Sequence, residues 1–279
     1  MKILAIGDFH GKFPNNLKKR IVQEDVDLIL GIGDYPDTNM LRKLEFKYWD
    51  SLDTLSLEDI IGNKKYKELM KKQGNSQLNV LKKIKSLGKP VFLIYGNSDL
   101  LDKESKKYGI NGLMSQCKIL KIGILTNHKK SFSGFDLLAF SGYRGAMLKK
   151  LGKFKKSDLK KIKKYNFKWN LRLVKLFDNF NSSKFSIFLA HDSIKGHFDL
   201  VKYKKSPLFK KHVGDEYLFK FVKKYKPDIF VAGHMHEYQG IKKLQKTSII
   251  SIGAAKDGKA TIIEILGNKK FKVRFLKSL

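Results

Sequence analysis

The stretch KILAIGDFHG, residues 2–11, is a run of apolar residues that stops abruptly at an acid, an aromatic, a histidine and a glycine. Asp8 and His10 are two positions apart, so their side chains point to the same side of an extended segment. A carboxylate and an imidazole directed at one point suggest a metal site. Because Asp and Gly are also ordinary turn formers, this stretch alone is equally compatible with a simple turn.

Four later apolar runs end in the same way, with a potential metal ligand directly after the strand. The candidates are Asp34 in GIGDYPD, Asn97 in YGNSD, His191 in LAHD, and His234 and His236 in VAGHMHE. One such end is uninformative, but five in one chain are hard to attribute to turns. Imidazole and carboxylate ligands suit Mn, Fe, Zn and related ions. Seven ligand residues exceed one tetrahedral site with an open position, so they favour two ions that share a carboxylate.

Apolar runs typical of buried strands alternate with helical patterns along the chain. The predicted strands are Ile3–Ile6, Leu28–Ile32, Val91–Tyr95, Leu137–Ser141, Ser186–Ala190, Ile229–Ala232 and Ile249–Ile252. Helical spacing predicts helices at Leu17–Val22, at Leu78–Leu87 and at Leu218–Val222. The segments Lys118–Thr126 and Ala260–Phe275 are more typical of antiparallel hairpins. We therefore predict an α/β fold with mixed sheets.

Length and composition favour a single domain that spans residues 1–279. The stretches 38–74 and 149–180 have few strand signals, and we expect both to be helical insertions over the strand ends. No apolar run approaches the roughly 20 residues of a membrane span. The single cysteine, Cys117, excludes an internal disulfide and a cysteine-cluster metal site. The N-terminus runs directly into a strand pattern, without a signal peptide, so we expect a cytoplasmic protein.

The charge is the anomaly of the composition. Lys and Arg number 58 against 26 Asp and Glu, which gives a net charge of +32. Such a surface attracts polyanions, so nucleic acid is one expected partner class beside phosphorylated metabolites and acidic membrane surfaces. The lysines of 149–180 are interleaved with aromatics that could stack on bases. The alternatives are a lysine-rich composition without function and an amphipathic helix whose Trp169, Leu173 and Leu176 form core.

The ordered set of motifs resembles that of the calcineurin-like metallophosphoesterases, from Asp8 to about Ile265. This resemblance implies a four-layer α/β/β/α sandwich of two mixed sheets. It implies a first ion held by Asp8, His10, Asp34 and His236. It implies a second ion held by Asp34, Asn97, His191 and His234, with Asp34 bridging. A hydroxide between the ions would attack phosphorus in line, and Mn is the expected metal, with Fe, Zn, Ni or Co as alternatives.

The predicted activity is hydrolysis of a phosphate ester, and a phosphodiester is the favoured substrate. Many members of the family have GNH, whose His protonates the leaving oxygen, whereas GNSD places Ser98 there. Serine is far too weak an acid for that task, but the leaving oxygen of a diester can be protonated by solvent or stabilised by a metal. The alternatives are a nuclease or RNA-processing phosphodiesterase, and a non-catalytic phosphate-binding or scaffold protein.

Further residues near the motifs have two interpretations each. Arg144 in SGYRGA could grip a phosphate and act in catalysis beside Asp34, Asn97 and His191, or it could be an ordinary surface residue. Asp37 and Asp99 could support a metal ligand or cap a helix. His197 could replace the missing acid or simply belong to its loop.

Overall fold

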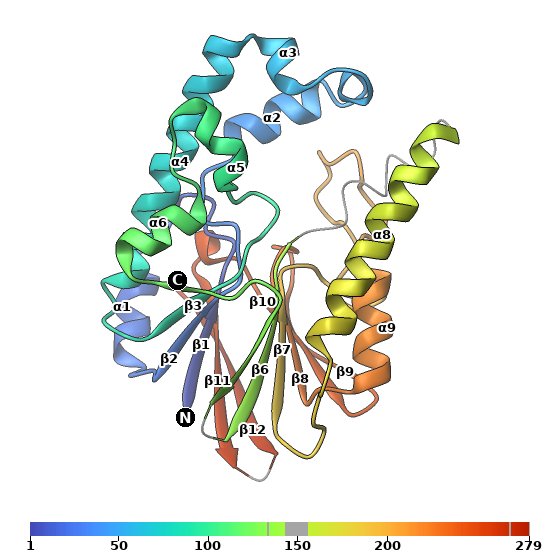
Figure 1. The fold of residues 1–279 in the computed structure, drawn as a ribbon. Coiled ribbons are helices and arrows are strands. Elements are labelled where there is room, and N and C mark those ends of the chain that lie inside the picture. The colour runs from blue at the N-terminus through green and yellow to red at the C-terminus, as the bar shows by residue number, and fades with distance from the viewer. Residues whose placement is uncertain (133, 143–155, 268, 279) are drawn as a thin grey trace.

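The computed structural model describes residues 1–132, 134–142, 156–267 and 269–278. Two six-stranded sheets pack face to face between helices (Figure 1). The first sheet has the order β12-β11-β1-β2-β3-β4 and consists of β1 (Lys2–Ile6), β2 (Leu28–Gly31), β3 (Val91–Leu93), β4 (Gly123–Ile124), β11 (Lys259–Gly267) and β12 (Lys270–Lys277). The second has the order β5-β6-β7-β8-β10-β9 and consists of β5 (His128–Phe132), β6 (Phe135–Phe140), β7 (Ser186–Ala190), β8 (Ile229–Ala232), β9 (Gln239–Leu244) and β10 (Thr247–Ile252).

Both sheets have parallel strands at their centre and antiparallel strands at one or both edges. In the first sheet, β1, β2, β3 and β4 pair in parallel, while β11 and β12 are antiparallel. In the second, β6, β7, β8 and β10 pair in parallel. The carboxyl ends of parallel neighbours meet at one edge of a sheet, so the loops that carry the candidate ligands are gathered at one end of the molecule.

Strand β1 shows why the sequence folds in layers. Leu4 and Ile6 pack into a core shared with the helices outside the first sheet. Ile3 and Ala5 belong to a second core, between the two sheets. Because alternate side chains point to opposite faces, a strand buried on both faces needs the continuous apolar run that the sequence shows.

Helices complete the outer layers. Those beside the first sheet are α1 (Asn15–Gln23), α4 (Asn63–Lys85) and α6 (Leu113–Leu120), and those beside the second are α8 (Lys156–Leu176) and α9 (Glu216–Tyr225) (Figure 1). On α8, Trp169, Leu173 and Leu176 are buried in the core of the second sheet, as expected for an amphipathic helix. The four layers are therefore α/β/β/α.

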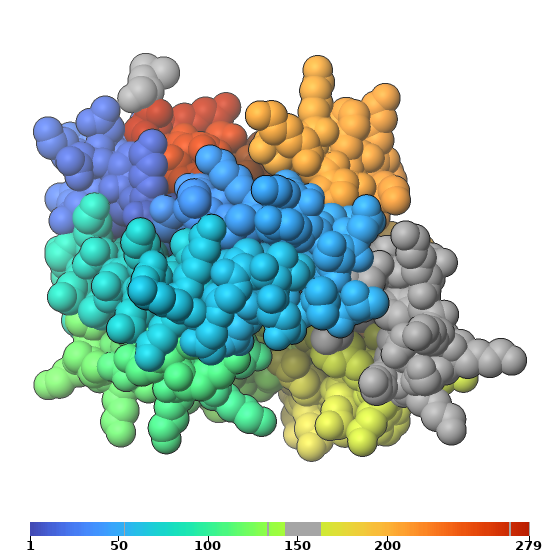
Figure 2. Space-filling model, turned by 90° about the horizontal axis from the view of Figure 1, so that it is seen from above, coloured from blue at the N-terminus to red at the C-terminus, as the bar shows by residue number. Residues whose placement is uncertain are grey.

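The segment 38–74 is helical, as predicted. It contains α2 (Asn39–Lys47), a short 3-10 turn, α3 (Leu57–Ile61) and the first half of α4. Seen from above, α2 and α3 (blue) lie beside the orange residues of the loop after β7 (Figure 2). The rings of Phe46 and Tyr203, one from each segment, have centroids 6.5 Å apart. Both segments thus lie at the end of the sheets where the ligand loops gather.

The prediction of an antiparallel hairpin at Lys118–Thr126 is wrong. The prediction of a hairpin at Ala260–Phe275 is confirmed by the antiparallel pairing of β11 with β12. Helix α6 continues to Leu120, Lys121 turns with a φ of 53°, and β4 then joins β3 in parallel. Apolar residues in this segment alternate as in a strand, but Leu113, Cys117 and Leu120 also share helical spacing and pack together in the core. The tertiary contacts of that helical face decide the structure.

Within the described part of the chain, no helix is both long and apolar enough to cross a membrane.

The second predicted helical insertion is segment 149–180. Its residues 149–155 lie outside the described residues, and the remainder contains α8.

Candidate metal centre

The loops after β1 and β2 are held side by side by backbone hydrogen bonds. The N–H of Asp8 donates to the carbonyl of Gly33 over 2.9 Å, and the N–H of His10 donates to that of Asp34 over 3.0 Å. Asp8, His10, Asp34 and His234 have φ values of 55°, 42°, 59° and 66°, a left-handed conformation that is uncommon without glycine. Such strain persists only where the surroundings enforce it, and it clusters at functional sites.

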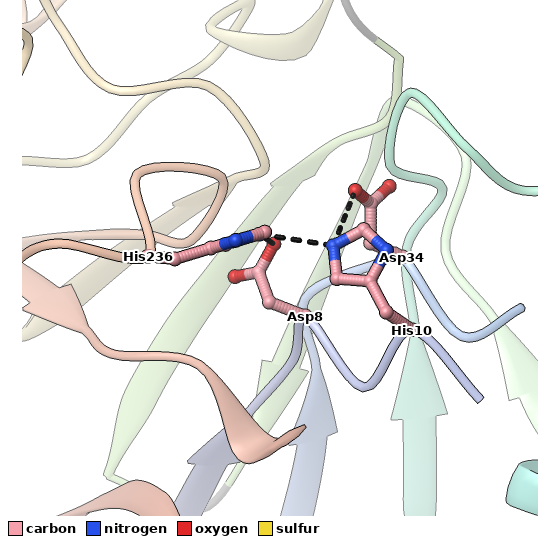
Figure 3. Close-up of side chains that lie close together, drawn as sticks. All are labelled: Asp8, His10, Asp34 and His236. Atoms are coloured by element: carbon pink, nitrogen blue, oxygen red, sulfur yellow. Dashed lines mark hydrogen bonds and ion pairs between the residues drawn. The ribbon is translucent and has the colours of Figure 1, made fainter. Parts of the chain in front are cut away.

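Four side chains from distant parts of the sequence form a first group (Figure 3). The Nε2 atom of His10 lies 2.9 Å from Nε2 of His236 and 3.5 Å from Oδ2 of Asp34. The Nε2 atom of His236 lies 3.2 Å from Oδ1 of Asp8. One ligand atom from each residue can be chosen so that all lie within 4.8 Å of one another, a spacing that one metal ion can bridge.

The polar atoms of this group fit a cation. The Oδ1 atom of Asp8 is buried, and although Nε2 of His236 lies 3.2 Å away, this oxygen accepts no hydrogen bond from the described residues, which is costly for a carboxylate. The Nδ1 atom of His10 lies 3.1 Å from the hydroxyl oxygen of Thr38, which can accept a hydrogen bond from an Nδ1–H group. That tautomer leaves a lone pair on Nε2 for a metal ion. Burial lowers the pKa of His10 well below its usual value despite the charge of Asp34, so the ring is neutral, as a metal ligand must be.

A second group lies on the other side of Asp34. The Nε2 atom of His191 lies 3.5 Å from Oδ1 of Asp34 and 2.9 Å from Oδ1 of Asn97. The Nδ1 atom of His234 also lies 2.9 Å from that Asn97 oxygen. The Nδ1–H of His191 donates to the carbonyl of Ile32 over 2.7 Å, which directs Nε2 into the group.

The second group also favours positive charge. His191 is fully buried, which on its own lowers the pKa of an imidazole. The carboxylates of Asp34, Asp8 and Asp192 outweigh that burial and raise the pKa of His191 to about 9. A place that stabilises a proton so strongly is suited to a metal cation, which competes for the same lone pair.

Asp34 belongs to both groups. Its Oδ2 faces His10 and its Oδ1 faces His191. The backbone N–H of Ser98 donates to Oδ1 over 2.9 Å, and the Ser98 hydroxyl donates to Oδ2 over 2.8 Å. Burial alone would raise the pKa of Asp34, but His191, His10 and the Ser98 N–H hold it well below its usual range. The carboxylate is therefore charged and fixed between the two histidines.

Two glycines make this close approach sterically feasible. Gly33 has a φ of +87°, and a Cβ at that position would collide with the backbone of Gly96. A Cβ on Gly96 would collide with Oδ1 of Asp34. The small residues before Asp34 and Asn97 therefore let the loops after β2 and β3 touch.

Asp99 supports the backbone around Asp34. It is buried and accepts hydrogen bonds from the N–H groups of Asp34, Tyr35 and Gly96 over 3.0, 2.8 and 2.7 Å. Burial and the neighbouring charge of Asp34 raise the pKa of Asp99 to about 7. Of the two interpretations of Asp99, support of a candidate ligand is the one that this geometry fits.

The contacts found for the other predicted neighbours are with residues outside the two groups, and one neighbour lies outside the described residues. Oδ1 of Asp37 accepts the N–H of Asn39 over 2.9 Å just before α2, whose N-cap residue is Thr38, so Asp37 contacts the start of that helix without capping it. The Nδ1 atom of His197 lies 3.3 Å from the carbonyl of Lys195, and its ring faces Phe219, so His197 belongs to its loop. Arg144 lies outside the described residues.

Two cations near the first group were missed by the sequence analysis. Arg42 lies one helical turn after Thr38 on α2, and the N–H of Lys256 donates to the carbonyl of Asp8 over 3.3 Å. Both charges contribute to the lowered pKa of His10. Lys256 follows β10 in GAAKDGK, so the strand-end pattern could have indicated it. The position of Arg42 depends on the path of α2, for which the sequence holds no comparable signal.

The fold has counterparts among known proteins. The family model of the calcineurin-like phosphoesterases matches residues 1–238. The protein TT1561 of Thermus thermophilus has a similar structure, with a TM-score of 0.56 at 12% identity over 98% of this chain and 97% of that one. A dimetal phosphatase from Danio rerio has a TM-score of 0.53 at 10% identity over 100% and 96% of the two chains.

A purple acid phosphatase from yellow lupin has a TM-score of 0.50 at 16% identity, and the match covers all of this chain but 51% of the phosphatase. No curated protein matches the sequence. At these identities the solved structures establish the metallophosphoesterase fold alone. The family model spans most of the chain and includes every candidate ligand, and the chain therefore belongs to the calcineurin-like phosphoesterase family.

Proposed function

We propose that this protein is a phosphodiesterase that depends on two metal ions. The observation that carries the proposal is the position of Asp34, whose two carboxylate oxygens face His10 on one side and His191 on the other. A carboxylate shared in this way is the ligand that a two-ion centre needs. Members of the calcineurin-like phosphoesterase family use two metal ions, and the match to its model supports a phosphoester hydrolase.

In this proposal each group holds one ion. Asp8, His10, Asp34 and His236 would bind the first, and Asp34, Asn97, His191 and His234 would bind the second. Bound ions would supply Lewis acidity to the phosphoryl oxygens and would lower the pKa of coordinated water. The mixed nitrogen and oxygen ligands favour Mn, with Fe, Zn, Ni and Co as alternatives.

The chain's own groups hold the substrate and fix the ligands. Arg42 and Lys256 lie beside the first group and would attract the negative charge of a phosphate. Thr38 and the carbonyl of Ile32 orient the rings of His10 and His191, and Ser98 and Asp99 hold Asp34 from two directions. Preorganisation of this kind places the reacting phosphorus without a further rearrangement.

A diester is preferred to a monoester because Ser98 is no general acid. Its hydroxyl donates to Asp34, and serine is too weak an acid to protonate a leaving oxygen near neutral pH. The leaving oxygen of a diester could instead be protonated by solvent or stabilised by a bound metal ion. The catalytic role of Arg144 remains a prediction.

The test is a hydrolysis screen of phosphate monoesters and diesters in the presence of Mn, with and without a chelator. We expect turnover of bis(4-nitrophenyl) phosphate to disappear with the chelator. Among esters with an alkyl leaving group, which unlike 4-nitrophenolate needs a proton, the diester should be hydrolysed faster than the monoester. The metal content of the purified protein should approach two ions per chain. Turnover that persists after the metal is removed, or a content of one ion at saturation, would contradict the proposal.

A further inference from the structure

A cavity of about 450 Å³ adjoins the second group of candidate ligands. One wall consists of residues that follow β3, β4 and β6, and the other is the inner face of α8. The residues used below are Tyr95, Asn97, Asn127, Tyr165, Trp169 and Arg172. Because Asn97 lines the cavity and also faces His191 and His234, a group attached to a phosphorus atom at this side of the centre can reach the cavity.

The wall formed by α8 is aromatic and cationic. The ring of Tyr165 stacks on that of Trp169, with centroids 6.0 Å apart and an angle of 27° between the planes. The guanidinium of Arg172 lies 5.0 Å from the centre of the Trp169 ring. Its Nη2 donates to the carbonyl of Ser141 over 2.6 Å and to the side-chain oxygen of Asn127 over 2.9 Å, so its plane is fixed at the cavity wall.

The cavity also contains polar groups suited to the edge of a flat ligand. Asn97 and Asn127 line it with side-chain amide groups, whose N–H groups can donate hydrogen bonds. Arg172 offers further N–H donors, and the carboxylate of Glu104 lines the same cavity and can accept. Flat faces together with mixed donors and acceptors are the features by which proteins bind nucleobases.

We propose that this cavity binds the nucleobase of the substrate, so that the diester hydrolysed at the metal centre is a nucleotide. The inference rests on the proposed function for its reaction and on the cavity for its substrate class. A volume of about 450 Å³ lies within the range of small-molecule sites. An aliphatic ester would use neither the stacked rings nor the guanidinium over Trp169.

Binding is tested without catalysis, by the fluorescence of Trp169 in a Trp49→Phe background with a chelator present. The chain has two tryptophans, so this background leaves the cavity residue as the single indole. The probes are adenosine 5′-monophosphate and guanosine 5′-monophosphate, and ribose 5-phosphate is the control ligand without a base. We expect a saturable change with the nucleotides and none with ribose 5-phosphate at the same concentration.

Variants on α8 assign the binding to the cavity. Tyr165→Leu removes the stacking face and should weaken nucleotide binding at least roughly tenfold, whereas Tyr165→Phe should retain it. Phe167→Leu is the matched control, because this ring is 68% exposed and does not line the cavity. If Tyr165→Leu does not fold, Arg172→Lys serves in its place and should weaken binding at least about fivefold, since lysine lacks the planar guanidinium.

The outcomes separate this inference from the proposed function. Equal responses to the nucleotides and to ribose 5-phosphate, or nucleotide binding unaffected by the α8 variants, would overturn the nucleobase site. Metal-dependent hydrolysis of bis(4-nitrophenyl) phosphate would persist in that case and would keep the proposed function. Nucleotide binding that Tyr165→Leu abolishes supports the nucleobase site even if no diester is hydrolysed, in which case the proposed reaction alone fails.

Discussion

The first and second groups of candidate ligands, which form the two halves of the candidate centre, hold similar side chains in different surroundings. In the first half, Asp8 and His10 are 1% and 3% exposed, and Thr38 at the start of α2 contacts His10. In the second half, Asn97 is exposed and lines the cavity beside α8. The side chain of His236 in the first half is 19% exposed and His191 in the second is fully buried, so the difference lies at single ligands: Asp8 and His10 are enclosed, whereas Asn97 borders a space that a substrate can enter.

The ligands of the two halves are also held in place in different ways. Left-handed φ values occur at Asp8 and His10 in the first half and at His234 in the second, but Asp8 and His10 are in addition fixed to the loop after β2 by backbone hydrogen bonds. Asn97 instead contacts His191 and His234 through its side chain. A change at Asp8 or His10 should therefore affect folding and metal binding together, and a change at Asn97 should affect mainly metal binding.

The largest effect is expected where the halves meet, at Asp34. Asp34→Asn removes the charge that both groups share, so we expect both ions to be lost and diester hydrolysis to fall more than about hundredfold, beyond the usual effect of residues that only support a ligand. Metal analysis and initial rates measure this. Asp50→Asn, at an exposed acid, is the control and should behave as the unmodified protein. Two tightly bound ions in Asp34→Asn would contradict a shared ligand.

The second prediction compares one residue from each half. Asn97→Ala should lower the metal content toward one ion and reduce hydrolysis roughly 10–100-fold. The Tm of the metal-free protein should fall only slightly, because the lost contacts are the hydrogen bonds of one exposed side chain to His191 and His234, each worth about 0.5–1.5 kcal/mol. His10→Ala leaves a buried hole and should lower that Tm as well. Asn97→Asp, which keeps an oxygen ligand, should restore the second ion. Equal decreases of Tm in both alanine variants would remove the distinction between the halves.

A smaller effect is expected from the cations beside the first half. Lys256→Met removes a charge next to Asp8 and should reduce kcat/KM for a diester about tenfold, mainly through KM, since charge-assisted hydrogen bonds contribute about 1.5–3 kcal/mol. The metal content should stay at two ions. Lys246→Met, at an exposed lysine in the turn before β10, is the control. Loss of an ion in Lys256→Met would show that the lysine supports the centre and does not bind substrate.

The contrast between the halves also shows how far the sequence could be interpreted. All seven predicted strands are present, because parallel strands buried on both faces require continuous apolar runs that few other elements produce. The ligand candidates were recognisable because each directly follows such a run. Where an element is short and covered on one side, as at Lys118–Thr126, the alternation of apolar residues was misleading.

The cavity and the position of Arg42 could not be derived from the sequence, for a physical reason. Arg172 lies in a lysine-rich helix, where nothing in the sequence distinguishes it from solvated neighbours, and its function depends on how α8 crosses the second sheet. Arg42 likewise depends on the direction in which α2 leaves Thr38. The sequence shows that Ser98 stands where many family members have the histidine of GNH. Its hydrogen bonds to Asp34 could not be predicted, because they form only where the loops after β2 and β3 come together.

The smallest effect on the hydrolysis of a small diester is expected from replacing lysines on the basic surface beside the second half. Lys163 and Lys164 are exposed on α8, the helix whose other face lines the cavity. If these lysines guide a polyanion toward the centre, replacing both with Gln should flatten the salt dependence of single-stranded nucleic acid binding by roughly 0.7 for each phosphate that the protein no longer neutralises. Binding is measured across a salt series without metal, and Lys82 and Lys83, both exposed on α4 beyond the first sheet, are replaced as the matched control pair. Hydrolysis of bis(4-nitrophenyl) phosphate should stay unchanged in both double variants, because that reaction depends on the ions. An unaltered slope for the α8 pair would mean that the charge of this helix is compositional, and the openness of the second half would then serve small nucleotides and not a nucleic acid strand.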